Sequence, residues 1–365
     1  MKNTVGNNLI SQRLYSLDIL RGFDMFWITG GGYLFHELAK LTNWGFLQSF
    51  SNQLEHVKWD GFALWDLIFP LFMFISGVAI PYALLQKREN GASKKSLYKK
   101  ITKRLILLIL LGLVYNGFLR LKLDNFRYAS VLGQIGFAYF FASLIAINFS
   151  RIKSLIMWLF GILAGYTVIQ LFIPVPGFGA GVLTPEGCIN GYIDRILLPG
   201  RLHGGSFDPE GWLCIISATG ITLMGAIAGT ILRNNKIDQI KKVIILALTG
   251  IGLFILGSIL KIWYPIIKSA WTTTFNLYAG GISFVLLAVF YLIADVWKYR
   301  KWGFYFKVIG LNSITIYIGT QIIDFRHTSR FLLGGLSDKL GDFGNLLSGL
   351  AYLAVIWIFL YYLYK

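Results

Sequence analysis

Long apolar runs alternate with short polar segments along this chain. The runs lie near ten ranges: 19–36, 62–86, 104–120, 131–149, 154–173, 212–232, 243–260, 276–295, 304–323 and 346–364. A helix needs about 20 apolar residues to cross the roughly 30 Å hydrocarbon core of a bilayer, and most of these runs have that length. The pattern therefore predicts an all-α polytopic membrane protein with about ten transmembrane helices, forming a single domain over residues 1–365.

The composition excludes an ordinary soluble domain. Of the 365 residues, 56% are hydrophobic and only 14% are charged, whereas a soluble domain is about one quarter charged. The abundance of Phe, Tyr and Trp also excludes a disordered chain. The first thirteen residues are polar, and the first apolar run has no small-residue processing site, so we expect a retained first span and not a cleaved signal peptide.

The net charge of +17 has a direction across the predicted membrane. Alternating the connections places 22 of the 34 Lys and Arg residues on the side of the N-terminus and 12 on the other side. Basic residues accumulate on the cytoplasmic side of membrane proteins, so we expect both termini to be cytoplasmic. The same sidedness explains the basic charge without nucleic-acid binding.

The two cysteines, Cys188 and Cys214, fall on or near the predicted outer face. An oxidising compartment there permits a disulfide, and two free thiols fit the sequence equally well. No spacing typical of a zinc site occurs, so no metal is expected.

Charged residues interrupt the beginning of the first span, where they are costly in a membrane. Asp18, Arg21 and Asp24 recur at three-residue spacing and so share one helical face. They form either a neutralised cluster that joins neighbouring helices, or a site where Arg21 meets an anionic group from the cytoplasm. The same span ends in Gly30, Gly31 and Gly32, which permit the close approach of another helix or of a cofactor.

The segment 55–70 is the polar stretch most suggestive of chemistry. His56 lies at the outer mouth of the second span, and a neutral imidazole can act as a general base or carry an acyl group. Asp66 lies just inside the span and can orient it. Trp59 and Asp60 suit a sugar-binding surface, although Trp is also common at membrane interfaces.

These segments together resemble the heparan-alpha-glucosaminide N-acetyltransferase family, from about residue 13 to the last span. The order of the motifs agrees as well. The motifs that carry the resemblance are Ser-Leu-Asp-x-Leu-Arg-Gly (16–22), Gly-Gly-Gly (30–32), His-x-x-Trp-Asp-Gly (56–61), Asp-Leu-Ile-Phe-Pro-x-Phe-x-Phe-x-x-Gly (66–77), Gly-Tyr-Ile-Asp-Arg (191–195), Asp-Pro-Glu-Gly (208–211) and Leu-Asn-Ser-Ile (311–314).

The resemblance implies a transmembrane acetyltransferase that takes acetyl from cytoplasmic acetyl-CoA to the amine of a glucosamine-type sugar on the far side. The family's active histidine matches His56, with His36 as the rival. The phosphates of acetyl-CoA need cationic partners, for which Arg21, Lys103 and Arg104 are candidates beside Gly30–Gly32. For any single lysine of the 87–104 segment, the ordinary cytoplasmic charge bias is the alternative explanation.

Two residues of a late span complete the predicted catalytic set of His56, Asp66, Asn312 and Ser313. Asn312 or Ser313 can stabilise the oxyanion that forms when the amine attacks the thioester, or they can simply join helices by hydrogen bonds. Direct transfer is favoured over an acetyl-histidine intermediate because an amine attacks a thioester without a covalent relay.

The long outer segment 174–211 supplies further candidate contacts to the acceptor sugar. Its carboxylates and arginine can bind hydroxyl and ammonium groups, and helix capping or loop salt bridges explain them equally well. Together with Trp59 and Asp60, the predicted acceptor contacts are Asp194, Arg195, Asp208 and Glu210.

Some expectations rest on departures from the family and on its general properties. Ile28-Thr29 stands where the animal enzymes have Asn-Tyr, and no large extracytoplasmic region precedes the first span, which leaves a polysaccharide acceptor such as heparan sulfate open. We expect the protein to be integral to a bacterial cytoplasmic membrane, and we expect it to form a homodimer. The alternative functions are an amino-sugar transporter and an O-acyltransferase.

Overall fold

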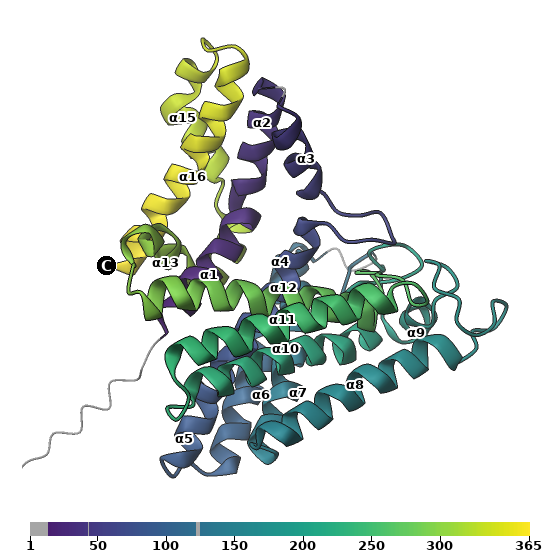
Figure 1. Cartoon of the computed structure of the whole chain (residues 1–365). Coiled ribbons are helices and arrows are strands. Elements are labelled where there is room, and N and C mark those ends of the chain that lie inside the picture. Colours follow the sequence, from purple (N-terminus) through teal and green to yellow (C-terminus); the bar gives the residue numbers. More distant parts are fainter. Residues whose placement is uncertain (1–13, 43, 122–124) are drawn as a thin grey trace, which may run out of the picture.

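The computed structural model describes residues 14–42, 44–121 and 125–365, so the predictions for the first thirteen residues lie outside the described part (Figure 1). Within it the fold is helical, and the extended pairings are isolated bridges, which confirms the all-α class. The elements are α1 (Tyr15–Phe26), η1 (Trp27–Gly31), α2 (Gly32–Thr42), α3 (Gly45–Gln53), α4 (Leu64–Ile80), η2 (Pro81–Leu85), α5 (Gln86–Glu89), α6 (Lys94–Tyr115), η3 (Phe118–Arg120), α7 (Val131–Asn148), α8 (Ile152–Phe172), α9 (Ile189–Leu197), α10 (Trp212–Arg233), α11 (Gln239–Leu260), α12 (Thr273–Tyr291), η4 (Leu292–Val296), η5 (Lys301–Gly303), α13 (Phe304–Leu311), α14 (Ser313–Ile322), α15 (Phe325–Ser337) and α16 (Asp342–Tyr364).

Seven continuous helices in the described residues are long and apolar enough to span a membrane. They are Leu64–Glu89, Val131–Asn148, Ile152–Phe172, Trp212–Arg233, Gln239–Leu260, Thr273–Val296 and Asp342–Tyr364. Three predicted spans differ from this set: α6 begins in the lysine-rich segment, and the first and ninth spans are broken helices. The total of ten and the side of the termini stay predictions.

Both broken helices have a local cause. Gly30 has a φ of +135°, a conformation that only glycine adopts readily, and it separates α1 from α2. Asn312 leaves the helical region at φ −115° and ψ +21°, and it separates α13 from α14. Each break exposes backbone groups that a continuous helix would pair.

Helix α10 is the centre of the larger bundle, which also contains α4, α6, α7, α8, α11 and α12. It packs backbone to backbone against α4, because a Cβ atom on Gly77 would lie 2.0 Å from the Thr222 carbonyl oxygen and one on Gly225 would lie 2.0 Å from that of Phe74. Helices α8 and α11 are peripheral, and they expose apolar side chains such as Met157, Phe160 and Leu248 on the outside of the bundle, as expected for contact with lipid.

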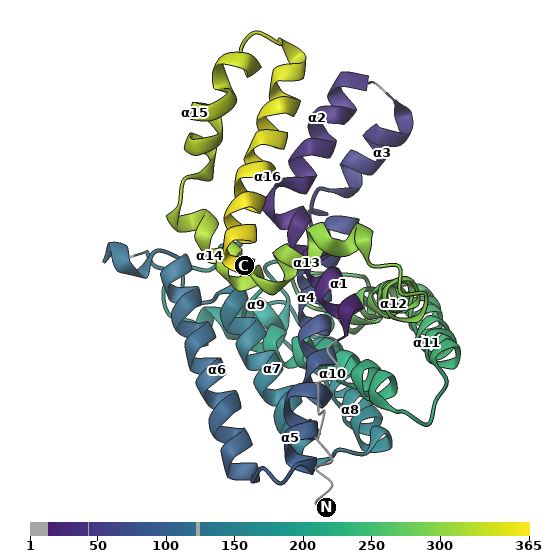
Figure 2. The same ribbon diagram turned by 90° about the vertical axis from the view of Figure 1, so that its left-hand side faces the viewer.

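The remaining long helices form a second group around α1 and α13. These two cross at Gly22 and Gly310, where a Cβ atom on Gly22 would lie 1.7 Å from the Phe306 carbonyl oxygen. Met25, Ile316 and Leu360 belong to a small separate core in this group. The pairs α2–α3 and α15–α16 project from the bundle on the same side in both views (Figures 1 and 2).

The two ends of the larger bundle differ in chemistry. One, the basic end, carries α5, the start of α6 and the turn between α10 and α11 with its Arg and Lys residues. The other, the α9 end, carries α9 and the long segments around it (Figure 1). The described cavities lie between these ends, at the junction of the two helix groups.

Candidate functional site

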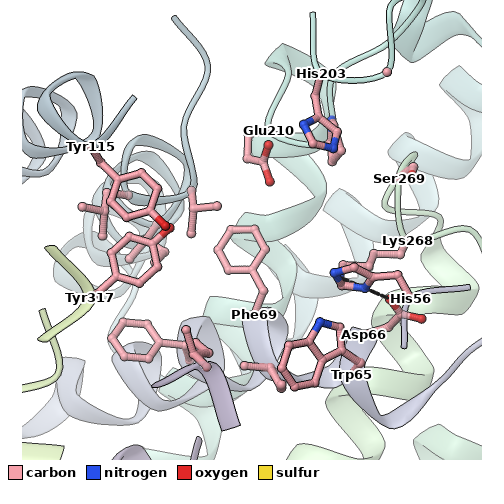
Figure 3. Close-up of a pocket in the computed structure, with 18 of the residues that line it drawn as sticks. His56, Trp65, Asp66, Phe69, Tyr115, His203, Glu210, Lys268, Ser269 and Tyr317 are labelled. Carbon is pink, nitrogen blue, oxygen red and sulfur yellow. Dashed lines mark hydrogen bonds and ion pairs between the residues drawn. The ribbon is translucent and has the colours of Figure 1, made fainter. Parts of the chain in front are cut away.

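A cavity of about 680 Å³ is lined by residues of the bundle and of the second helix group, and Figure 3 shows 18 of the side chains that line it. We call it the large cavity. Helices α1, α4, α6, α7 and α14 contribute to its lining, together with four connecting segments. The chemically active groups among its lining residues are His56, Asp66, Tyr115, Arg127, His203, Glu210, Lys268, Ser313 and Tyr317.

His56 and Asp66 form a hydrogen-bonded pair on one wall of the large cavity, as Figure 3 shows. The His56 Nδ1 atom lies 2.7 Å from the Asp66 Oδ1 atom. A carboxylate that accepts from Nδ1 fixes the tautomer in which Nε2 carries the lone pair. Nε2 is then the nitrogen left to take a proton from a substrate, which is the geometry of a general base.

Asp66 is held rigidly in the first turn of α4. Its Oδ2 atom accepts a hydrogen bond from the backbone nitrogen of Ala63 at 3.2 Å, while only 2% of its side chain is exposed. Its position near the helix N-terminus also stabilises the negative charge. By contrast, 57% of the His56 side chain is exposed, so the imidazole is accessible from the cavity.

Lys268 completes this wall from the connection between α11 and α12. Its Nζ atom lies 3.2 Å from Asp66 Oδ1 and 3.1 Å from His56 Nδ1. Burial lowers the pKa of the Lys268 ammonium, and the negative charges of Asp66 and Glu210 oppose that shift.

A second charged cluster lies across the cavity. Arg127 donates from Nε and Nη2 to the two Asp208 oxygens at 2.8 and 2.6 Å, and it also binds Glu210. Burial, reinforced by Asp208 and opposed by Arg127, raises the pKa of Glu210 to about 7. Glu210 therefore changes charge in the physiological range and faces the cavity (Figure 3).

Aromatic and imidazole groups complete the lining. The rings of Tyr115 and Tyr317 stack with centroids 4.5 Å apart and planes 11° apart, joining α6 to α14 (Figure 3). His203 lies near the mouth, where burial, followed by the charge of Arg127, lowers its pKa.

A smaller cavity of about 340 Å³ continues from the large one toward the basic end. The small cavity shares five lining residues with the large cavity, and this shared neck consists of Phe72, Leu132, Ile135, Ser313 and Ile314. Along α6 the lining runs from Tyr115 to Arg104, eleven residues or about 16 Å. The two cavities therefore adjoin at these residues, and together their linings extend over about half of the roughly 30 Å hydrocarbon thickness.

The small cavity suits an anion. Its charged lining residues in the described part of the chain are Arg21, 3.7 Å from Asp18, and Arg104, whose guanidinium stacks 3.8 Å over the Tyr139 ring. Residues Ser313 to Thr315, the first turn of α14, also line it, and a helix N-terminus favours negative charge.

Of the two late-span candidates, Ser313 has the better position for chemistry. It lies at the neck, where it lines both cavities. Asn312 lines the small cavity alone, and its amide nitrogen donates to the Val308 carbonyl at 3.1 Å. This bond ends α13, which is a structural use of the amide.

The three adjacent glycines serve packing in this structure. A Cβ atom on Gly32 would lie 2.9 Å from the Trp65 ring, and one on Gly31 would lie 2.4 Å from Phe26. None of the three lines either cavity. Lys103 is exposed and also lies outside both linings, so of the predicted cofactor contacts the cavities bring together Arg21 and Arg104.

The predicted acceptor contacts divide in the same way. Glu210 lines the large cavity, whereas Trp59 donates to the Leu183 carbonyl at 2.8 Å, and the exposed Asp60 pairs with Ile267. Neither Trp59 nor Asp60 is part of the lining.

The other predicted contacts of the segment 174–211 hold the chain together, which was the alternative explanation. Asp194 accepts from the backbone nitrogens of Trp212 at 3.1 Å and Asp208 at 3.3 Å, which caps α10. Burial raises the pKa of Asp194 to about 7. Arg195 donates to the Ser206 and Glu186 carbonyls.

Several other predicted features have no place in the cavities. His36 contacts Ser51 at 2.5 Å between α2 and α3. Cys188 and Cys214 are buried free thiols, so the disulfide does not form here. In the predicted cluster of Asp18, Arg21 and Asp24, Arg21 lies 3.7 Å from Asp18, whereas both buried Asp24 oxygens are without a hydrogen-bond partner among the described residues.

Sequence reasoning missed Lys268, Arg127 and His203. Each lies in a connection remote in sequence from His56, and no spacing relates them to it. A weak signal existed for Lys268, because it is one of two charged residues between the apolar runs 243–260 and 276–295.

A family described as a domain of unknown function (DUF5009) matches residues 13–122 of this chain. The heparan-alpha-glucosaminide N-acetyltransferases of Mus musculus and Homo sapiens are each 29% identical to this chain, over 74% of it and 49% of the relative. The chain thus spans about half the length of the curated relatives it matches. These matches confirm the resemblance inferred from the motifs: over most of its length the chain is similar to the heparan-alpha-glucosaminide N-acetyltransferases.

Proposed function

We propose that this protein is a membrane acetyltransferase that moves the acetyl group of acetyl-CoA to the amine of a glucosamine-type sugar. The observation that carries the proposal is the pair of adjoining cavities, with Arg21 and Arg104 in the lining of the small one and the hydrogen-bonded His56–Asp66 pair in that of the large one. The names of the homologous proteins support the reaction class.

In the proposed orientation, acetyl-CoA lies along the two adjoining cavities, with its phosphates in the small cavity and its thioester in the large cavity. Arg21, Arg104 and the first turn of α14 offer cationic and backbone donors for its phosphates. The pantetheine arm then extends through the neck, and the thioester reaches the large cavity beside His56. The basic end is the expected cytoplasmic side, so the cytoplasmic supply of acetyl-CoA is consistent with this orientation.

The transfer step needs a base, a neutral amine and an oxyanion donor. The bound ammonium first releases one proton to solvent. The resulting free amine attacks the thioester carbonyl while His56 Nε2 removes a second proton from the nitrogen. Ser313 at the neck stabilises the oxyanion. The tetrahedral adduct then expels the CoA thiolate, which takes the proton from the His56 imidazolium, so that the products are the N-acetyl sugar and CoA thiol.

Glu210 is the proposed anchor for the acceptor. Its carboxylate faces the large cavity, and as an anion it attracts an ammonium group into the cavity that His56 also lines. Asp66 keeps the base in its productive tautomer throughout the reaction.

The test is transfer of radiolabelled acetyl from acetyl-CoA to glucosamine by the purified protein in detergent. We expect transfer by the wild type and by His36→Ala, and loss of transfer in His56→Ala. A wild type that binds the sugar saturably, without CoA binding and without transfer, would instead favour an amino-sugar transporter. Acetylation on oxygen, seen in the product by mass spectrometry after mild base treatment, would favour the O-acyltransferase.

A further inference from the structure

We propose that Lys268 is a positioning residue that keeps His56 uncharged at rest by neutralising Asp66. The Nζ atom of Lys268 and the Nδ1 atom of His56 share one oxygen, Asp66 Oδ1, at 3.2 and 2.7 Å. The two nitrogens are themselves 3.1 Å apart. This inference rests on the proposed function only in taking His56 as the base.

The loop that carries Lys268 is anchored by hydrogen bonds on both sides of this residue. The Ala270 carbonyl accepts from the Tyr166 hydroxyl at 2.7 Å and from Gln170 at 2.9 Å. On the other side, the Ile266 carbonyl accepts from the backbone nitrogen of Gly61 at 2.8 Å, which ties the loop to the segment that carries His56.

The residue Trp271 adds to this rigidity. It has a φ of +48°, which is strained for a residue with a Cβ atom, and its side chain is fully buried. Its carbonyl accepts from the Ser217 hydroxyl at 2.5 Å. A backbone fixed in this way places the Lys268 ammonium beside His56 with little loss of side-chain freedom on reaction.

The electrostatic consequence follows from the burial of Asp66. A buried carboxylate without a cationic partner is costly, and His56 would supply that partner by protonation. An imidazolium locked to Asp66 could not act as a base. When the ammonium of Lys268 is that partner, it repels a second positive charge on the imidazole about 3 Å away. The proposed result is that His56 stays neutral.

Other charged groups face this wall from the surrounding segments, and the variants below leave them unchanged. They are Lys58 beside His56, His203 and Glu210 between α9 and α10, and Arg127 between α6 and α7.

The test measures the nucleophilicity of His56 directly. Diethyl pyrocarbonate modifies neutral imidazole, and peptide mass spectrometry follows the rate at His56 as a function of pH. In Lys268→Met we expect the midpoint of the acidic limb to move up by about one pH unit. Lys268→Arg, which keeps the charge, should stay near the wild type, and so should Lys261→Met, a matched change at the exposed end of α11.

A double variant keeps the test decisive if Lys268→Met folds poorly. Removing both buried charges in Asp66→Asn/Lys268→Met leaves no uncompensated ion. We expect Asp66→Asn alone to lower the midpoint, because the imidazolium loses its carboxylate partner while the ammonium of Lys268 remains. The double variant should have a higher midpoint than Asp66→Asn, because the ammonium 3.1 Å from His56 Nδ1 no longer repels a positive charge on the imidazole. A rise of the double variant above Asp66→Asn supports the inference, and identical midpoints overturn it.

The measurement also separates this inference from the proposed function. The labelling requires neither acetyl-CoA nor a sugar, so a shift in Lys268→Met without acetyl transfer by the wild type would overturn the function and keep the inference. In an active enzyme, a shift of this size should lower kcat of Lys268→Met by at most tenfold at pH 7. The rate should recover toward pH 9, with the KM for acetyl-CoA unchanged. An unchanged midpoint in Lys268→Met overturns the inference whether or not the enzyme is active.

Discussion

Replacing Glu210 by glutamine should weaken the binding of the amino acceptor without disturbing the base. The glutamine keeps the size of the side chain and removes its charge. Arg127 retains Asp208 at 2.6 and 2.8 Å, so the cluster does not lose its buried ion pair. The substitution should therefore weaken the proposed ammonium site in the large cavity and leave the His56–Asp66 hydrogen bond unchanged.

The expected size follows from the cavity. Two unit charges 4 Å apart interact by about 4 kcal/mol at an effective dielectric constant near 20. Arg127 already offsets part of the Glu210 charge. The loss of binding free energy on removing that charge should therefore be closer to that of one charged hydrogen bond, about 1.5–3 kcal/mol. That range corresponds to an increase of about 10- to 100-fold in the KM for glucosamine.

The pH dependence gives the prediction its sign. The pKa of Glu210 is raised to about 7, and only the ionised carboxylate attracts an ammonium. The wild-type KM for glucosamine should therefore rise as the pH falls from about 8 to 6, whereas the KM of Glu210→Gln should be high and nearly flat over that range.

The assay is steady-state acetyl transfer at saturating acetyl-CoA, with glucosamine varied at each pH. Glu186→Gln is the control, since Glu186 is an exposed carboxylate of the same end that lies outside the cavity. A Glu210→Gln variant with an unchanged KM and a reduced kcat would refute the assignment of Glu210 as the acceptor anchor.

Two further predictions concern the small cavity and the helix crossing. Arg104→Gln should raise the KM for acetyl-CoA by about tenfold in the same assay, while the exposed neighbour Lys103→Gln should leave it unchanged. Equal effects of the two changes would contradict an anion site at Arg104. Gly310→Val should lower the melting temperature in detergent by several degrees, since even a Cβ atom there would lie 2.0 Å from the Asp18 carbonyl oxygen. An unchanged melting temperature would show that α1 and α13 can separate at low cost.

The sequence was sufficient for the class of fold. Apolar runs of membrane-spanning length predict helices, since each helix satisfies its own backbone hydrogen bonds in lipid. The runs at 212–232 and 243–260 correspond to α10 and α11 within a few residues. The pattern did not distinguish a central helix such as α10 from a peripheral one such as α11, because both are apolar on all sides.

The hydropathy pattern predicted the breaks within the helices less well than the helices themselves. The glycines at 30–32 marked one break, and their predicted role in cofactor approach was based on the lack of side chains. In the structure, the absence of side chains at these glycines allows their backbone to pack closely against Trp65 and Phe26. At Asn312 the hydropathy continues through the break, so the apolar run predicted one span where α13 and α14 are separate.

His56 and Asp66 lie ten residues apart, and the nature of their side chains singled them out before their contact was known. Lys268 is more than two hundred residues from His56 in the chain, and its approach depends on how α11, α12 and their connection pack. Periodicity describes the faces of single helices, whereas a catalytic wall joins groups from several elements. The sequence by itself therefore determined the membrane helices, the charge bias and the candidate base, and only the tertiary packing decided which cations meet Asp66 and where the two cavities join.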